Sequence, residues 1–140
     1  MKSLFVDTSV WYSAADSADK SNLQAKEILS SEQGNLITSD HVLLETSLLI
    51  RIRLGKNQAR TFWQSLRDGV ARLEVTQTSD LEGAWNIGQT FLDQDFSIAD
   101  RTSFALMTRL GINRAASFDR DFSLFRYGPG KKKAFEVLSA

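Results

Sequence analysis

Four acidic residues of this chain could support metal-dependent chemistry: Asp7, Glu45, Asp100 and Asp119. Carboxylates gathered in a partly dry cleft repel one another, so such a cluster requires a countercharge, and a divalent metal ion is its simplest source. The chain has no cysteine and one histidine. Oxygen ligands alone favour Mg2+, with Mn2+ as a substitute, over zinc. Sites of this kind hydrolyse phosphodiesters, because the metal activates water and neutralises charge on the in-line transition state.

Two of these carboxylates directly follow predicted strands. Ser3–Val6 is a short apolar run that leads into Asp7, and the run Arg114–Phe118 leads into Asp119. In an open parallel sheet, ligands bind beyond the carboxyl ends of the strands, so the two aspartates are expected to meet at one edge. Each also has a structural alternative. Asp7 could cap the helix that follows it, and Asp119 could begin a turn.

The other two carboxylates lie on predicted helices. Asp100 falls in the first turn of a helix at about 98–110, whose N-terminus faces the same sheet edge because the helix follows a crossover. Glu45 lies among apolar residues of a helix at 40–54, where an acid is out of place unless it is paired or binds metal. Alternatively, Asp100 could complete a capping box that begins at Ser97. Glu45 could instead form an ion pair, and the cations considered are Arg53, Lys56 and Arg101.

Short strands alternate with helices along the chain. Strands are predicted at 3–6, 36–38, 72–76, 114–118 and 134–137, and helices from residue 8 and at 19–31, 40–54, 57–68, 79–92 and 98–110. Asp40 is the predicted cap of the third helix. This alternation predicts a three-layer α/β/α fold with a mainly parallel central sheet. The length of 140 residues, without repeat or linker, suits a single domain.

Composition is that of an ordinary globular protein, with 42% hydrophobic and 24% charged residues. Seventeen basic residues balance seventeen acidic ones, so no overall positive charge indicates a nucleic-acid partner, and any such binding would depend on local basic patches. The charge at position 7 comes too early for a signal peptide or membrane span, and the absence of cysteine fits a reducing compartment. A cytoplasmic protein without membrane attachment is expected.

Two basic segments could supply such a patch. Lys131–Lys133 could hold an RNA backbone, although a short charge run near a terminus could equally be a solvated face. A second candidate patch consists of Arg51, Arg53, Lys56, Arg60 and Arg67. His41, beside the predicted helix cap, is expected to have a structural role or to be exposed.

Several segments together resemble the PIN domains and, within them, the VapC-like ribonuclease toxins of toxin–antitoxin pairs. The matching segments, in the same order and spacing, are residues 5–11, 44–46, 96–100, 103–107, 110–112 and 116–122. The resemblance implies that residues 1–140 form a single PIN-like nuclease domain. It also implies an acidic quartet of Asp7, Glu45, Asp100 and Asp119 around one or two Mg2+ or Mn2+ ions. The implied hydroxyl support comes from Thr8, Ser9 and Ser117.

The same resemblance implies a metal-dependent endoribonuclease that cuts single-stranded RNA, pairs as a homodimer and is silenced by an antitoxin protein. Two residues depart from the family pattern. Arg101 replaces a small residue or cysteine and is expected to bind substrate phosphate or to pair with Glu45. Asp121 replaces a frequent histidine and is a possible fifth carboxylate. The alternatives are a non-catalytic PIN-fold binding module and a PIN nuclease that acts outside a toxin–antitoxin pair.

Overall fold

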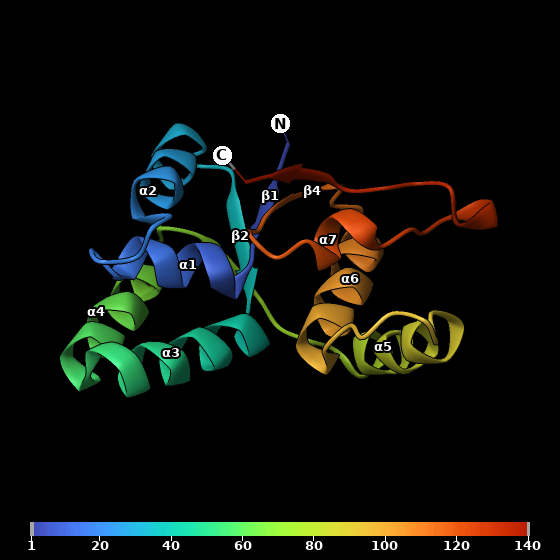
Figure 1. The fold of residues 1–140 in the computed structure, drawn as a ribbon, viewed down its shortest axis with the longest axis horizontal. Helices are drawn as coiled ribbons and strands as arrows, with labels where there is room; N and C mark the ends of the chain where they lie inside the picture. The colour runs from blue at the N-terminus through green and yellow to red at the C-terminus, as the bar shows by residue number, and fades with distance from the viewer. Residues whose placement is uncertain (1, 140) are drawn as a thin grey trace.

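The computed structural model describes residues 2–139, in which five parallel strands form one sheet (Figure 1). The strands, in the spatial order β3-β2-β1-β4-β5, are β1 (Leu4–Val6), β2 (Leu36–Ser39), β3 (Arg72–Glu74), β4 (Arg114–Ala116) and β5 (Glu136–Leu138). The helices are α1 (Thr8–Ala15), α2 (Asn22–Ser31), α3 (Asp40–Leu54), α4 (Lys56–Arg67), α5 (Thr78–Thr90), α6 (Ile98–Leu110), α7 (Asp121–Leu124) and the 3-10 turn η1 (Pro129–Lys131).

The helices form a layer on each side of the sheet. Figure 1 shows α1 to α4 on one side and α5 to α7 on the other. The predicted α/β/α fold is therefore confirmed, and every strand pair within residues 2–139 is parallel. The central strand is β1, with β2 on one side and β4 on the other. Crossover connections diverge at this strand, and such a switch point opens a crevice at the carboxyl ends of the strands.

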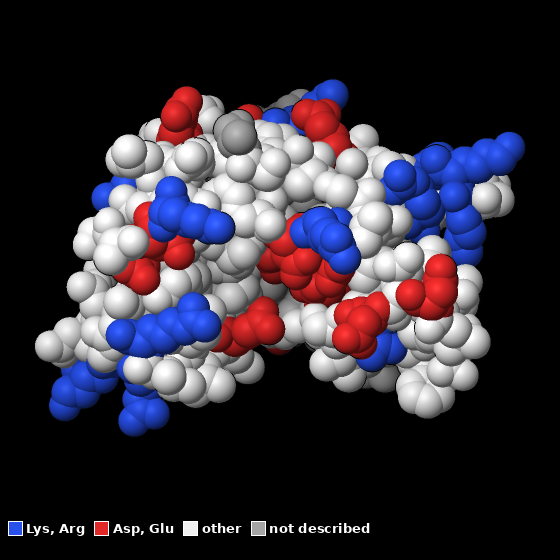
Figure 2. Space-filling model, viewed as in Figure 1, with Lys and Arg blue, Asp and Glu red and all other residues white. Residues whose placement is uncertain are grey.

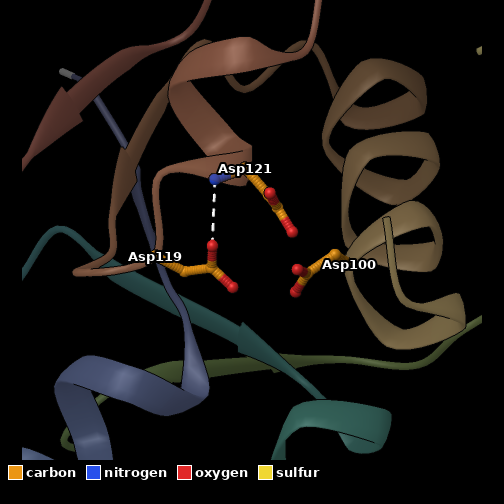
Figure 3. A group of neighbouring side chains, drawn as sticks. All are labelled: Asp100, Asp119 and Asp121. Atoms are coloured by element: carbon orange, nitrogen blue, oxygen red, sulfur yellow. Dashed lines mark hydrogen bonds between the residues drawn. The ribbon is translucent and has the colours of Figure 1, made fainter. Parts of the chain in front are cut away.

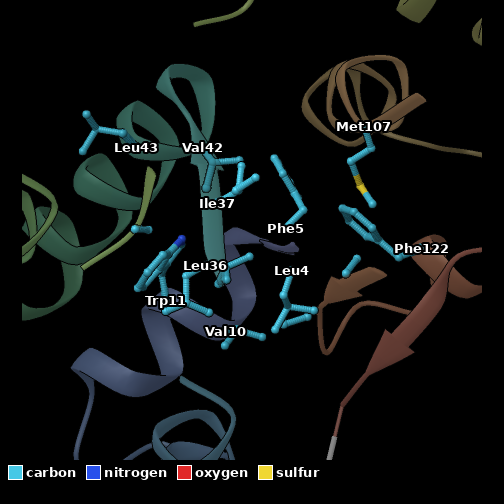
Figure 4. Close-up of a cluster of buried hydrophobic side chains, with 14 of the residues drawn as sticks. Leu4, Phe5, Val10, Trp11, Leu36, Ile37, Val42, Leu43, Met107 and Phe122 are labelled. Carbon is cyan, nitrogen blue, oxygen red and sulfur yellow. The ribbon is translucent and has the colours of Figure 1, made fainter. Parts of the chain in front are cut away.

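Apolar strands fill the middle of the molecule. Leu4, Phe5 and Val6 are fully buried, as expected for a central parallel strand covered on both faces. Figure 4 shows Leu4 and Phe5 among the buried side chains around them. On the α6 side, Phe104 stacks on Phe125 with ring centroids 4.4 Å apart. These rings and the residues of β1 belong to one buried core cluster, and Asp7 follows β1 directly.

The start of α3 differs from the prediction. Ser39, not Asp40, is the N-cap, because the Ser39 hydroxyl accepts a hydrogen bond from the backbone N–H of Val42 at 3.1 Å. The Asp40 carboxylate instead accepts hydrogen bonds from the backbone N–H and the hydroxyl of Thr76, at 2.8 and 2.6 Å. Asp40 thus joins α3 to the segment that follows β3.

The bounds of other elements also differ from the predicted ones. Strands β3 and β4 end two residues earlier than predicted, β5 begins two residues later, and α7 was not predicted. The bounds of α6 agree with the prediction, and Gly111 ends it in the left-handed conformation that glycine favours, with φ of 69°. Within residues 2–139, no helix combines the length and apolar character needed to cross a bilayer.

Candidate active site

One cleft, of about 460 Å³, opens at the carboxyl ends of β1 and β4. The acidic residues that line it are Asp7, Glu45, Asp95, Asp100, Asp119 and Asp121. Figure 2 shows acidic side chains gathered in the middle of this face, where the surface is hollowed. The structure therefore brings together the four acids singled out in the sequence, with Asp121 among them. Asp95 was missed, because an acid in a polar linker carries no distinguishing signal.

Asp7 lies directly after β1, and 5% of its surface is exposed. The hydroxyls of Ser9 and Ser117 both donate to its Oδ2 atom, each at 3.0 Å. Asp7 occupies the N-cap position of α1, yet its side chain makes no capping hydrogen bond. Burial raises the pKa of this carboxyl, and the two serine hydroxyls oppose the rise. The capping alternative is therefore not the arrangement observed here.

Asp100 lies in the first turn of α6 and is 7% exposed. Ser97 caps the helix, because its hydroxyl accepts from the backbone N–H of Asp100 at 3.0 Å. The Asp100 carboxylate points toward Asp119 and Asp121 (Figure 3). Burial, followed by the charges of Asp7, Asp119 and Asp121, raises the pKa of Asp100 to about 8. In the absence of a bound cation, this carboxyl holds a proton at neutral pH.

Asp119 lies three residues after β4, and a local turn sets its direction. Its backbone N–H donates to the Ser117 hydroxyl at 3.0 Å, and its Oδ1 atom accepts from the backbone N–H of Asp121 at 2.9 Å (Figure 3). Asp119 therefore begins a turn, as the structural alternative proposed, and also lines the cleft. The same turn starts α7 and brings the Asp121 carboxylate beside that of Asp100.

Glu45 is exposed at the cleft, so the expectation that it lies buried among apolar residues is wrong. The Thr8 hydroxyl donates to its Oε1 atom at 2.6 Å, and the Thr46 hydroxyl donates to Thr8 at 3.2 Å. Across residues 2–139, the ion pairs within 4.0 Å do not include Glu45. Thr8 rather than a basic residue orients this carboxylate, and the proposed pairing of Glu45 with arginine or lysine is absent.

Arg101 is not brought into the cleft. It follows Asp100 by one residue, a rotation of about 100° around the helix, which directs it toward α5. There it lines a second depression with Gly88 and Phe91, which shares Asp95 with the cleft. A Cβ atom at Gly88 would lie 1.9 Å from Nη1 of Arg101, so a larger residue there would require the guanidinium to shift. The buried Nε of Arg101 has no hydrogen-bond partner within residues 2–139.

His41 has the expected structural role. Its Nδ1 lies 2.9 Å from the Thr76 hydroxyl, and its Nε2 lies 2.9 Å from the Ser103 hydroxyl. Burial lowers the pKa of His41, which favours the neutral ring that these contacts suit. Because Ser103 belongs to α6 and His41 to α3, the ring ties together the two helices that carry Asp100 and Glu45.

The residues present fit a divalent cation. One carboxylate oxygen each from Asp100, Asp119 and Asp121 lie within 4.8 Å of one another. Asp7 and Glu45 line the same cleft outside this group of three. Burial, and after it the charges of the neighbouring carboxylates, raises the pKa of Asp100, and a bound cation would oppose both effects. A donor set composed of oxygens alone suits a hard cation such as Mg2+ or Mn2+.

Comparison with known proteins gives concordant matches. The PIN domain family matches residues 4–126. The chain is 37% identical over 121 residues to the 23S rRNA-specific endonuclease VapC20 of Mycobacterium tuberculosis, covering 86% of this chain and 92% of the relative. It is also similar to the crystal structure of VapC20, a sarcin-ricin loop cleaving toxin, with a TM-score of 0.83 and 34% identity over 87% of this chain and 94% of that one.

A more distant structure shares the fold. The DNA-bound VapBC structure from Salmonella typhimurium matches with a TM-score of 0.63 at 10% identity, over 83% of this chain and 84% of that one. At this level of identity the match concerns the fold alone.

Proposed function

The chain belongs to the PIN-domain family, in its VapC-like branch, and we propose that it is a metal-dependent endoribonuclease that acts as the toxin of a toxin–antitoxin pair. The observation that carries this proposal is the convergence of six carboxylates from four separate parts of the chain on one cleft. A non-catalytic binding module would have no need of these acids. Because the relative VapC20 is a 23S rRNA-specific endonuclease, ribosomal RNA is the proposed substrate class.

The proposed ligands of the ion are Asp100, Asp119 and Asp121, with Asp7 completing the set. Mg2+ is the proposed ion and Mn2+ its substitute; when bound, it lowers the pKa of water and stabilises charge on the in-line transition state. Ser9 and Ser117 fix the Asp7 carboxylate, so it does not have to reorganise during the reaction. The N-termini of α1 and α6 border the cleft and favour a phosphate nearby.

Glu45 has a different proposed role. Thr8 holds its Oε1 atom, which leaves Oε2 to orient a water molecule or to accept its proton. An exposed carboxylate that solvent water can reach is suited to this task, whereas Asp100 in the crowded group is suited to binding a cation. The two acids are on helices that His41 ties together.

The remaining features of the proposal come from the family. A homodimer and a cognate antitoxin are its proposed partners, and the cytoplasm, where ribosomal RNA lies, is its proposed location. In support of a protein partner, α3 exposes Leu44, Leu48 and Ile52, which form an apolar stripe along the helix. Residues 1–140 are proposed to act as a single nuclease domain, because the described part contains one sheet and one core cluster.

The proposed function can be tested by incubating the purified chain with ribosomal RNA and with a mixed RNA pool, in Mg2+, in Mn2+ or in excess chelator, and mapping the cut ends. We expect cleavage in either metal and none in chelator. Asp100→Asn should lower the rate by about two orders of magnitude or more. Asp93→Asn, which changes an exposed acid outside the cleft, is the matched control and should cleave as the wild type does. Full cleavage in excess chelator would exclude the metal mechanism.

The role as a toxin has its own readout. Induced expression of the wild-type chain should arrest bacterial growth, and expression of Asp100→Asn at the same level should not. A chain that cleaves RNA in vitro but never arrests growth belongs to the alternative class of PIN nucleases that act outside toxin–antitoxin pairs.

A further inference from the structure

A basic turn, residues 126–133, projects from the side of the protein beyond α7. It carries Arg126, Lys131, Lys132 and Lys133. Tyr127 and Lys133 close its base through two backbone hydrogen bonds, at 3.0 and 3.1 Å. Figure 1 shows η1 at its tip, and Figure 2 shows basic side chains gathered over the same region. The turn therefore presents its cations to solvent on the face that also shows the acidic cleft.

Stacked aromatic rings attach the basic turn to the core. Phe125 stacks on the fully buried Phe104, Tyr127 lies nearly parallel to Phe125 at an interplanar angle of 12°, and Tyr127 also stacks on Phe135 with centroids 5.0 Å apart. Both ends of the turn are thus held by rings that contact the core. A surface fixed in this way loses little conformational entropy when it binds a ligand.

The cations of the basic turn have no acidic partner within residues 2–139. Ion pairs there involve Arg72, Arg109 and Arg114, and none involves Arg126 or the three lysines. All three lysines are exposed. In a chain of zero net charge, this is a local excess of positive charge, which attracts a polyanion.

A second cavity, of about 420 Å³, lies beside the basic turn, between it and helices α5 and α6. Its aromatic lining comes from Phe91, Phe125 and Tyr127. Asn86 and the cation Arg126 also line it, and Lys131 completes the side next to the turn. Phe125 is 3% exposed and is stacked by Phe104 and Tyr127, so a nucleobase would contact the partly exposed rings of Phe91 and Tyr127. An amide suits the edge of the base, and cations suit the adjoining phosphates.

This cavity lies close to the carboxylate cleft. Asp121 lines the cleft, Phe125 lines the second cavity, and α7 is the only element between them in the chain. A helix of four residues spans about 6 Å. The two linings are therefore joined by one short segment of the chain.

We propose that the basic turn and this cavity form an RNA-docking surface. The lysines and Arg126 hold backbone phosphates of a strand that leaves the cleft, and the cavity accepts one of its unstacked bases. The inference rests on the proposed function in taking RNA as the ligand. An acidic protein segment could form ion pairs with the lysines, but its carboxylates would not fill the aromatic cavity.

The charge of the turn can be tested with Lys131→Gln/Lys132→Gln/Lys133→Gln. The matched control is Lys2→Gln/Lys20→Gln/Lys26→Gln, which removes three other exposed lysines. Binding of a fluorescein-labelled single-stranded RNA oligonucleotide is measured in chelator, where cleavage is absent, at several salt concentrations. The plot of log affinity against log salt concentration has a negative slope, and loss of three phosphate contacts makes it shallower by about 2. Binding at 0.15 M salt then weakens roughly 50-fold. The control should keep the wild-type slope.

The cavity is tested separately with Asn86→Trp, which fills it from an exposed position of α5 without changing charge. We expect weaker RNA binding with an unchanged salt slope. A turn variant that keeps the wild-type slope, or a wild type that binds poly-glutamate of matched charge as tightly as the RNA, would overturn the docking surface.

These outcomes are distinguishable from failure of the proposed function. Suppose that the wild type binds RNA with a steeper salt dependence than the turn variant but does not cut RNA in Mg2+ or Mn2+. This result would refute the ribonuclease function and would still support the docking surface. A wild type that cuts RNA, together with a turn variant that binds RNA normally, refutes the docking surface alone.

Discussion

Replacing Asp100 by asparagine should stabilise the metal-free protein, and increasingly so as the pH rises. The folded chain holds a proton on Asp100 up to about pH 8, whereas in the unfolded chain this carboxyl titrates near its ordinary value of 3.8. Because the pKa is raised on folding, the stabilising effect of this proton is complete below pH 3.8 and is lost as the pH rises toward 8. Asparagine has no such proton to lose.

The size of this pH effect on the free energy of unfolding follows from the single proton that Asp100 binds. Between these two pKa values the free energy of unfolding of the wild type falls by about 1.4 kcal/mol per pH unit relative to Asp100→Asn. From pH 5 to pH 7 this amounts to about 3 kcal/mol, or about 10 °C in the melting temperature of a chain of this size. His41, whose pKa is lowered by burial, contributes a dependence of the opposite sign, but it is present in both proteins and cancels in the difference.

The assay is thermal unfolding followed by circular dichroism in excess chelator at several pH values. Asp93→Asn, in the exposed linker, should follow the wild type throughout. Added Mg2+ or Mn2+ should raise the melting temperature of the wild type by mass action and raise that of Asp100→Asn much less. If the wild type and Asp100→Asn gave parallel curves across this range, the pKa of Asp100 would not be raised in the folded chain, and its assignment as a metal ligand would fail.

Three further predictions concern side chains around the site. Thr8→Val should lower the cleavage rate about tenfold by releasing Glu45, whereas Thr8→Ser, which keeps the hydroxyl, should restore it; equal rates would show that Thr8 does not position Glu45. Arg109→Ala should lower the free energy of unfolding in urea by about 3 kcal/mol, because Asp80, which is 1% exposed, loses its ion-pair partner; a loss below about 1 kcal/mol would contradict this. Arg101→Ala should change kcat and KM for RNA by no more than about twofold, since its side chain lies outside the cleft, and a tenfold rise in KM would place it on the substrate.

The parts of the fold that were predictable from the sequence are those where the local pattern and the environment agree. Strand β1 is buried on both faces, so its apolar run and the acid that ends it were readable without knowledge of its neighbours. Helix α6 begins at a serine cap and ends at Gly111, and both signals are local. Asp7 and Asp100 were placed correctly at the cleft because each lies within a residue or a turn of such a boundary.

The direction in which a side chain leaves a helix cannot be predicted from neighbouring residues in the sequence alone, because it depends on what packs against the helix. Arg101 turns away from the cleft because α5 packs against α6 and Gly88 leaves space for the guanidinium. Neither the packing of this pair nor the role of Gly88 is visible in the sequence around Arg101. Likewise, Asp121 enters the group of three acids through a turn that begins at Asp119, and its approach to Asp100 depends on how β4 and α6 are placed by the rest of the sheet.

The prediction that Glu45 is buried was wrong for a different reason, which is that α3 carries apolar residues on two faces. One face, which includes Val42, Thr46 and Ile50, is buried in the protein. The other exposes the apolar stripe of Leu44, Leu48 and Ile52, at 69%, 57% and 72%. A pattern of apolar residues does not distinguish a face buried within the chain from a face that a second protein covers. Glu45 was read as buried because its neighbours on this face are apolar, although they are exposed. A proposed partner that covers this stripe would also lie against the cleft, which Leu48 and Ile52 line together with Glu45.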